Sequence, residues 1–256
     1  MRKFSACVEW LFADEAEDFS DRIRLAAKAG FDAFEFWHWT NKDIGKIETA
    51  MRESGIRLAS FVAEPMISLT DPANHAAFLE GLRSAVELAQ RLGAMTLIAQ
   101  AGNDRPGVNR AEQRAALTEC LVGASEILRD SGVSLGLEPL NTRIDHVGYF
   151  LGSTVEGLDI VDEVASPSLK IVYDVYHSAV MDEKTEMVLK DRVERVAHVH
   201  FADHPGRNQP GSGNIDLRER LNWIFANGYE GYVGFEYRPV GGTSAQMAGV
   251  FERLAG

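Results

Sequence analysis

The sequence predicts an α/β protein, a (β/α)8 TIM barrel that forms one domain over residues 1–256. Three observations support this fold. The length of 256 residues is typical of one such barrel. Short apolar runs alternate with segments of helical periodicity, as in parallel sheets with helical crossovers. The eight apolar runs fit closure into a barrel better than an open doubly wound sheet.

The apolar runs are rich in β-branched and aromatic residues, which is typical of buried strands. In chain order they cover residues 4–8, 33–37, 57–62, 94–99, 133–138, 169–174, 195–201 and 231–236. Helical spacing is clear in the segments 19–30, 76–93, 111–132 and 244–256. The first two helical segments end on glycine, which is common just after a helix. No G-x-G-x-x-G motif follows the first run, so a dinucleotide-binding fold is disfavoured.

The amino-acid composition argues against nucleic acids and membranes as binding partners. The chain has 38 acidic residues against 26 Lys and Arg, a formal net charge of −12. Nucleic acids are bound by clustered basic side chains, so we expect no nucleic-acid partner. No signal peptide is recognised and no apolar run reaches 18 residues, so we expect a cytoplasmic protein without a membrane partner. Cys7 and Cys120 have no metal-ligand spacing and are predicted to be reduced, buried thiols.

Residues with metal-ligand chemistry lie at the ends of four consecutive predicted strands. TIM barrels place the active site at the carboxyl ends of their strands. The fifth to eighth strands bring Glu138, Asp174, His200 and Glu236 to that end. Three carboxylates gathered in a low-dielectric barrel mouth repel one another unless a cation neutralises them. The pattern therefore predicts one divalent metal ion, with a metal-free carboxylate cluster as the alternative.

The predicted ligand set also indicates the kind of metal. Oxygen donors with one imidazole favour Mn²⁺, Mg²⁺ or Co²⁺, and Zn²⁺ is less favoured because no thiolate is present. His198 lies two residues before His200 on the same predicted strand and faces the same side at another depth. We therefore expect His198 to pack beside the ligands rather than join them.

Several motifs resemble those of hydroxypyruvate isomerases, which belong to a wider xylose isomerase-like TIM barrel superfamily that also contains ketose 3-epimerases. The motifs are LGLEPLNTRIDHVGYFL (135–151), YDVYH (173–177), HVHFADHPGRNQPGSGNID (198–216) and GFEYRPVGGT (234–243). The resemblance covers nearly the whole chain and places the family's metal ligands on the four residues named above. It departs at His200, where hydroxypyruvate isomerases often have Gln, and at Asn214, where many have Glu. Both departures lie in or beside the predicted pocket, so they bear on which substrate is bound rather than on the type of reaction.

The resemblance implies an isomerase that transfers a proton next to a carbonyl through an enediolate, converting hydroxypyruvate to tartronate semialdehyde or acting on a related small keto acid. Glu138 and Glu236 are the candidate bases, and the sequence leaves open which one acts. A ketose 3-epimerase or sugar isomerase acting on a neutral sugar is the alternative. Other classes are an endonuclease IV-like phosphodiesterase and an inactive barrel that binds sugars. A small molecule is the expected partner, and a homo-oligomer is left open.

The predicted substrate contacts lie in loops after the strands. The resemblance makes His177 a hydrogen-bond partner of substrate oxygens. Arg207 lies in a glycine- and proline-rich loop that resembles an ordered lid, where a guanidinium suits a substrate carboxylate. Near the second strand we expect substrate contacts or pocket walls from Glu35, Trp37, His38 and Trp39. Further candidate polar groups are Arg143, Arg238, Gln100 and Asn103.

Overall fold

Eight parallel strands close into a barrel in the computed structural model, which describes residues 2–254. Each strand pairs with the next in sequence, and β1 pairs with β8 to complete the closure. The strands are β1 (Lys3–Cys7), β2 (Ala33–Phe36), β3 (Arg57–Val62), β4 (Thr96–Gln100), β5 (Ser134–Glu138), β6 (Leu169–Asp174), β7 (Val196–Phe201) and β8 (Tyr232–Phe235). The predicted TIM barrel is confirmed.

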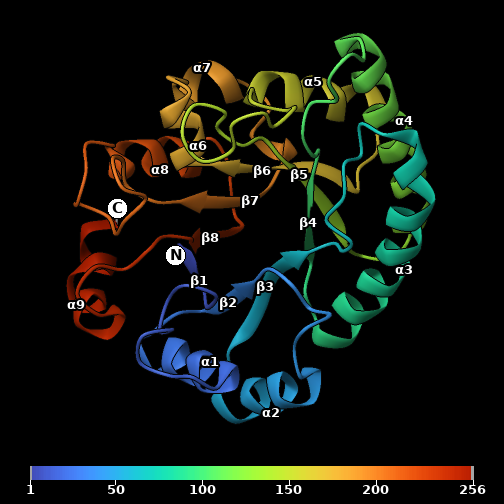
Figure 1. The fold of residues 1–256 in the computed structure, drawn as a ribbon. Coiled ribbons are helices and arrows are strands. Elements are labelled where there is room, and N and C mark those ends of the chain that lie inside the picture. The colour runs from blue at the N-terminus through green and yellow to red at the C-terminus, as the bar shows by residue number, and fades with distance from the viewer. Residues whose placement is uncertain (1, 255–256) are drawn as a thin grey trace.

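Helices surround the barrel on the outside (Figure 1). They are α1 (Phe19–Lys28), α2 (Ile44–Ser54), α3 (His75–Leu92), α4 (Arg110–Leu128), α5 (Thr154–Val164), α6 (Val175–Val180), α7 (Thr185–Leu189), α8 (Leu217–Ala226) and α9 (Thr243–Leu254), with 3-10 turns at Pro72–Asn74 and Val193–Arg195. The four helices predicted from periodicity correspond to α1, α3, α4 and α9, although the last two residues of the predicted fourth helix lie outside the described range.

Helices α2 and α8 were not among those predicted from periodicity. Helix α2 buries only Ile47 and Ala50, and α8 buries Leu217, Leu221 and Ile224. None of the helices in the described chain is long and apolar enough to cross a membrane.

The apolar core lies both inside the barrel and between the barrel and the helices. Phe235 of β8 contacts Phe201 of β7 and Phe4 of β1, with ring centroids 4.6 and 5.3 Å apart, and it also contacts Phe251 of α9. This aromatic packing fixes β8 against its neighbours just before the chain leaves the barrel at Glu236. Cys7 and Cys120 are both buried free thiols, as predicted.

Candidate metal centre

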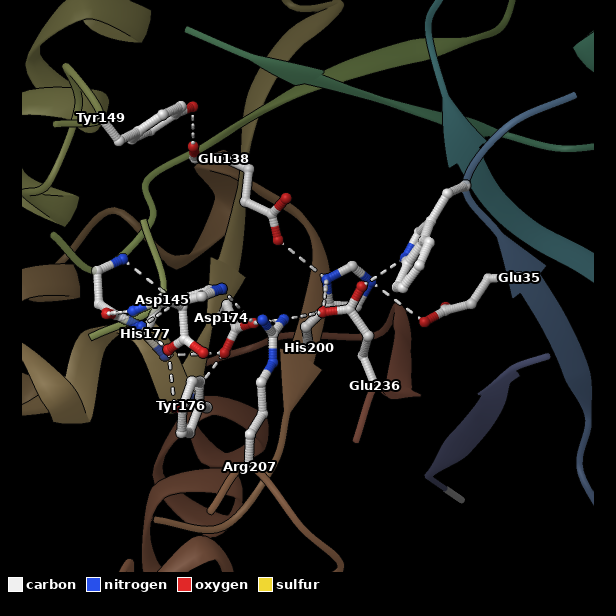
Figure 2. A network of polar contacts seen from close by, with 12 residues as sticks. Glu35, Glu138, Asp145, Tyr149, Asp174, Tyr176, His177, His200, Arg207 and Glu236 are labelled. Carbon is white, nitrogen blue, oxygen red and sulfur yellow. Dashed lines mark hydrogen bonds and ion pairs between the residues drawn. The ribbon is translucent and has the colours of Figure 1, made fainter. Parts of the chain in front are cut away.

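The four predicted metal ligands meet at the carboxyl end of the barrel. Glu138 and Asp174 are the last residues of β5 and β6, His200 lies one residue before the end of β7, and Glu236 follows β8 directly. Each residue offers a ligand atom, and these atoms all lie within 4.8 Å of one another. All four side chains are buried, with exposed fractions between 2 and 7%. Figure 2 shows them pointing toward a common point.

The charges in this cluster require compensation. Burial raises the pKa of Glu138, and the neighbouring carboxylates of Glu236 and Asp174 add to the rise. Burial likewise raises the pKa of Asp174. Burial opposes a charge on His200, yet the carboxylates around it, Glu35 first, raise its pKa well above the ordinary value. The three buried carboxylates thus favour a positive charge among them. Oxygen donors with one imidazole are a ligand set that fits a divalent cation.

The imidazole of His200 has two different sides. Its Nδ1 lies 3.1 Å from Oε1 of Glu138 and 3.9 Å from Oε2 of Glu236. Its Nε2 lies 3.1 Å from Oε1 of Glu35, on the opposite side of the ring (Figure 2). Nδ1 is therefore the nitrogen that faces the other candidate ligands.

Glu236 is held by two donors. The indole Nε1 of Trp37 donates to Oε1 over 2.8 Å, and Nη2 of Arg207 donates to Oε2 over 2.6 Å. Burial would raise the pKa of Glu236, but His200 and Arg207 lower it below the ordinary value. Glu236 is thus an ionised carboxylate in a fixed orientation.

Arg207 lies across the mouth of the cluster. Its guanidinium carbon sits 4.9 Å from the ring centre of Trp10 and 5.2 Å from that of Tyr176. Nη2 also lies 3.9 Å from Oδ2 of Asp174, and the side chain is only 12% exposed. Its Nε is buried and has no hydrogen-bond partner among the described residues. The guanidinium therefore keeps a donor for a further acceptor.

His177 is a neutral donor with a fixed tautomer. The backbone N–H of Asn141 donates to Nδ1 of His177 over 3.2 Å, so the ring proton is on Nε2. Burial and the nearby Arg207 charge lower the pKa of His177 well below its ordinary value. Nε2 lies 3.6 Å from Oδ2 of Asp174 and has no hydrogen-bond partner in the described chain. An N–H group is thus available beside the candidate ligands.

Asp174 connects this donor to the cluster. Its Oδ1 caps helix α6 by accepting from the backbone N–H groups of Tyr176 and His177 over 2.7 and 3.0 Å. Capping by one oxygen leaves Oδ2 to face the ligands. The helix therefore sets both the orientation of the carboxylate and the position of His177.

Residues 203–216, the Arg207 loop, are ordered by a buried carboxylate. Oδ1 of Asp203 accepts from the N–H groups of His204 and Ile215, at 2.9 and 3.1 Å. Oδ2 accepts from those of Gly211 and Gly213, both at 2.9 Å. A Cβ at position 213 would lie 2.3 Å from the His204 carbonyl oxygen, so this turn requires glycine. The loop that presents Arg207 is thus held at both ends and in the middle.

Several predicted substrate contacts lie elsewhere. Glu35 is 2% exposed and lies behind His200, next to His198. His38 is half-exposed, and its Nδ1 lies 3.0 Å from Oε1 of Glu64. Arg143 pairs with Asp182, away from the cluster. The structure thus brings His177, Arg207 and Trp37 into contact with the candidate ligands. Glu35 instead contacts His200 from the side of the ring away from Glu138, and His38 contacts Glu64.

The weaker candidates are not brought to the ligands by any contact in the described chain. The Arg238 guanidinium lies 5.2 Å from the Trp10 ring centre. The Asn103 carbonyl accepts from Ser68, and Gln100 ends β4. Trp39 packs at the edge of the core, and its backbone N–H donates to Oε2 of Glu64 over 2.8 Å.

Some residues at the site were not found from the sequence. They are Trp10, Asn141, Asp145, Tyr176 and Asp203. Asp145 accepts from Asn141 and from the Tyr176 hydroxyl at 2.7 and 2.8 Å, which braces the His177 side of the site (Figure 2). Four of them, all but Trp10, fall inside the motifs that carried the family resemblance, and this was the available signal. Trp10 follows the first strand with no pattern to mark it.

Known proteins resemble this chain over nearly its full length. A family model described as xylose isomerase-like TIM barrel matches residues 23–254. A human protein named putative hydroxypyruvate isomerase is 33% identical, covering 94% of this chain and 91% of its own. A 2-oxo-tetronate isomerase of Cupriavidus necator is 31% identical, with 96% of each chain covered. A crystal structure from Brucella melitensis, described as AP endonuclease, family 2, has a TM-score of 0.90 at 27% identity, with 97% of each chain covered.

Proposed function

Because the chain belongs to the xylose isomerase-like TIM barrel family, we propose that it is a metal-dependent isomerase of small keto acids. The observation that carries this proposal is the convergence of four buried candidate ligands from β5 to β8. The relatives supply the substrate class, because hydroxypyruvate and 2-oxo-tetronate are both short acids with a ketone beside the carboxylate and a hydroxyl on the next carbon. Conversion of hydroxypyruvate to tartronate semialdehyde is the leading reaction.

One divalent ion would be held by the four ligands, with His200 contributing Nδ1. Mn²⁺, Mg²⁺ or Co²⁺ suits this oxygen-rich set better than Zn²⁺. When bound, the ion supplies Lewis acidity that stabilises negative charge on the substrate oxygens as the proton leaves.

Glu138 is the better placed of the two candidate bases. Among the described residues only Oε1 of Glu138 has a side-chain polar contact, with Nδ1 of His200 at 3.1 Å, so Oε2 is free. Both oxygens of Glu236 already accept hydrogen bonds, from Trp37 and Arg207. A base needs a free oxygen within reach of the carbon-bound proton. We therefore assign proton transfer to Glu138 and a supporting role to Glu236.

Arg207 and His177 would bind the substrate on the other side. The unpaired Nε of Arg207 and the neutral Nε2–H of His177 are both buried donors that lack a partner in the described chain. A carboxylate next to Arg207 gains a charge-assisted hydrogen bond, and His177 suits a carbonyl or hydroxyl oxygen. The aromatic rings of Trp10 and Tyr176 both pack against the guanidinium, which is 12% exposed.

A substrate panel in deuterium oxide tests this function. Protein loaded with Mn²⁺, Mg²⁺ or Co²⁺ is expected to convert hydroxypyruvate or a four-carbon analogue, with NMR showing deuterium entering the carbon next to the carbonyl. Neutral ketoses are the comparison substrates. If no keto acid is converted with any of these ions, the proposal fails. If neutral ketoses are converted with a higher kcat/KM, the epimerase alternative replaces it.

Replacing Arg207 by Lys is expected to raise KM for the keto acid about 10- to 150-fold. This range corresponds to the loss of one charged hydrogen bond of about 1.5–3 kcal/mol. Lys keeps the charge but cannot present the planar pair of donors that a carboxylate accepts. The effect on any neutral ketose should be much smaller.

Arg238→Lys is the matched control, because its guanidinium packs on the same Trp10 ring and, among the described residues, contacts none of the four candidate ligands. Its KM should stay near that of the wild type. Equal effects of Arg207→Lys on acids and neutral sugars would show that Arg207 does not recognise a carboxylate.

A phosphodiesterase is the second candidate, because the Brucella structure described as an AP endonuclease is similar over the whole barrel. The net charge of −12 argues against a nucleic-acid substrate. Absence of cleavage of an abasic-site DNA duplex in the same metal panel is the expected result.

A further inference from the structure

We propose that Glu35 positions the metal-binding imidazole of His200, holding Nε2 so that Nδ1 carries the lone pair for the ion. Glu35 is then a positioning residue of the metal centre rather than a contact of the substrate. This inference rests on the proposed metal centre and specifies how one of its ligands is oriented.

The contacts of Glu35 carry the proposal. Oε1 of Glu35 lies 3.1 Å from Nε2 of His200. Both atoms are buried, and neither makes a hydrogen bond in the described chain, so their ion-pair contact is with each other. The Oε2 atom accepts from Ser5 Oγ at 2.7 Å and lies 2.8 Å from Nε2 of His198. One oxygen is thus anchored by two groups, and the other faces only the imidazole.

The barrel makes room for this carboxylate at one position. Gly234 on β8 is paired in register with Ser5 of β1 and His200 of β7. A Cβ at position 234 would lie 2.3 Å from Oε1 of Glu35 and 2.7 Å from Cδ2 of His200. Both approaches are far closer than carbon atoms tolerate. Glycine therefore leaves a slot in which the carboxylate meets the ring.

This arrangement has a chemical consequence. An imidazole that donates one N–H to a carboxylate is fixed in tautomer and rotation, and its other nitrogen becomes a better metal donor. On the opposite side, Nδ1 of His200 lies 3.1 Å from Glu138, another candidate ligand of the ion. Glu35 and the ion would therefore act on the two nitrogens of one ring.

A second ion is the competing explanation of the same residues. Glu35, His198 and His200 offer ligand atoms within 4.8 Å of one another. However, Oε2 of Glu35 is already used by Ser5 and His198, and His200 would need to bridge two ions as a doubly deprotonated ring. We therefore interpret Glu35 as a residue that positions His200 rather than as a ligand of a second ion. This interpretation predicts one ion per chain.

The first test measures Zn²⁺ and Mn²⁺ affinity of the metal-free protein by calorimetry. Glu35→Gln keeps the shape of the side chain but removes its charge, and it is expected to weaken binding about 10- to 100-fold. Ser60→Ala is the matched control. Ser60 pairs with Glu35 across β2 and β3, and its buried hydroxyl has no hydrogen-bond partner in the described chain, so affinity should not change.

The second test needs no variant. In Zn²⁺-loaded protein with ¹⁵N-labelled histidine, NMR should show His200 protonated at Nε2 and coordinated through Nδ1. Coordination through Nε2, unchanged affinity in Glu35→Gln, or two ions per chain would each overturn the positioning role. Wild-type protein that binds no ion would overturn the proposed function as well, so the two failures are distinguishable.

Discussion

Chelation by EDTA is expected to lower turnover by at least about 10³-fold while the barrel stays folded. The loss follows because a Lewis acid supplies several kcal/mol of stabilisation to developing charge on substrate oxygens. The fold should survive because a chain of this size buries enough apolar surface without a metal. Elemental analysis should find about one divalent ion per chain before treatment, and circular dichroism monitors the fold.

Restoration by metal is the control for this experiment. Adding Mn²⁺, Mg²⁺ or Co²⁺ to the chelated protein should recover activity, and the ion that gives the highest kcat identifies the preferred metal. Full turnover in protein shown to be free of metal would contradict the mechanism directly.

Replacing Glu138 by Gln is expected to lower kcat by about 10²–10⁴-fold, the range for loss of a general base. The amide oxygen remains a metal ligand, so the variant should still bind an ion, with reduced affinity. Loss of deuterium exchange at the carbon next to the carbonyl should accompany the fall in kcat. Both readouts are needed because weaker metal binding alone would lower activity without implicating the base.

Two further variants are compared with Glu138→Gln to separate loss of metal binding from loss of the base. Asp174→Asn should mainly weaken metal binding, because one oxygen of Asp174 caps α6 and no proton transfer is assigned to it. Glu236→Gln should reduce kcat less than Glu138→Gln at saturating metal. If Glu236→Gln abolishes exchange while Glu138→Gln with bound metal retains it, the assignment of the base is reversed.

The convergence of the four candidate ligands could be predicted because it depends on a simple geometric rule. Parallel strands in a barrel all end at one rim, so the last residues of four consecutive strands must be close whatever the loops do. Glu138 and Asp174 are the last residues of their strands in both the prediction and the structure. The predicted strand limits were off by one or two residues at every strand except β3 and β6, and this did not move a candidate ligand away from the rim.

The depth of a side chain within the barrel was harder to predict. Glu35 and Trp37 face the same side, because side chains alternate along a strand. Trp37 reaches Glu236 at the rim, whereas Glu35 lies opposite Cys7 in register and points at the inner side of His200. The different depths of Glu35 and Trp37 depend on the stagger between neighbouring strands. That stagger cannot be read from a single sequence.

Contacts between loops could not be predicted from the sequence for a different reason. His38 pairs with Glu64 because the loops after β2 and β3 meet, and no local pattern encodes that meeting. Arg143 likewise pairs with Asp182, far along the chain. The positions of such residues follow from tertiary packing rather than from periodicity.

The four hydrogen bonds to Asp203 have a consequence for the entropy of substrate binding. A small keto acid has few atoms, and the affinity available per atom is limited to about 1.5 kcal/mol at best. Ordering a mobile loop costs about 1–2 kcal/mol per residue, which would consume that affinity. Because Asp203 fixes the backbone of the Arg207 loop at His204, Gly211, Gly213 and Ile215, this ordering is completed during folding. Arg207 then meets a small ligand from a preorganised loop, and most of the contact energy remains available for affinity.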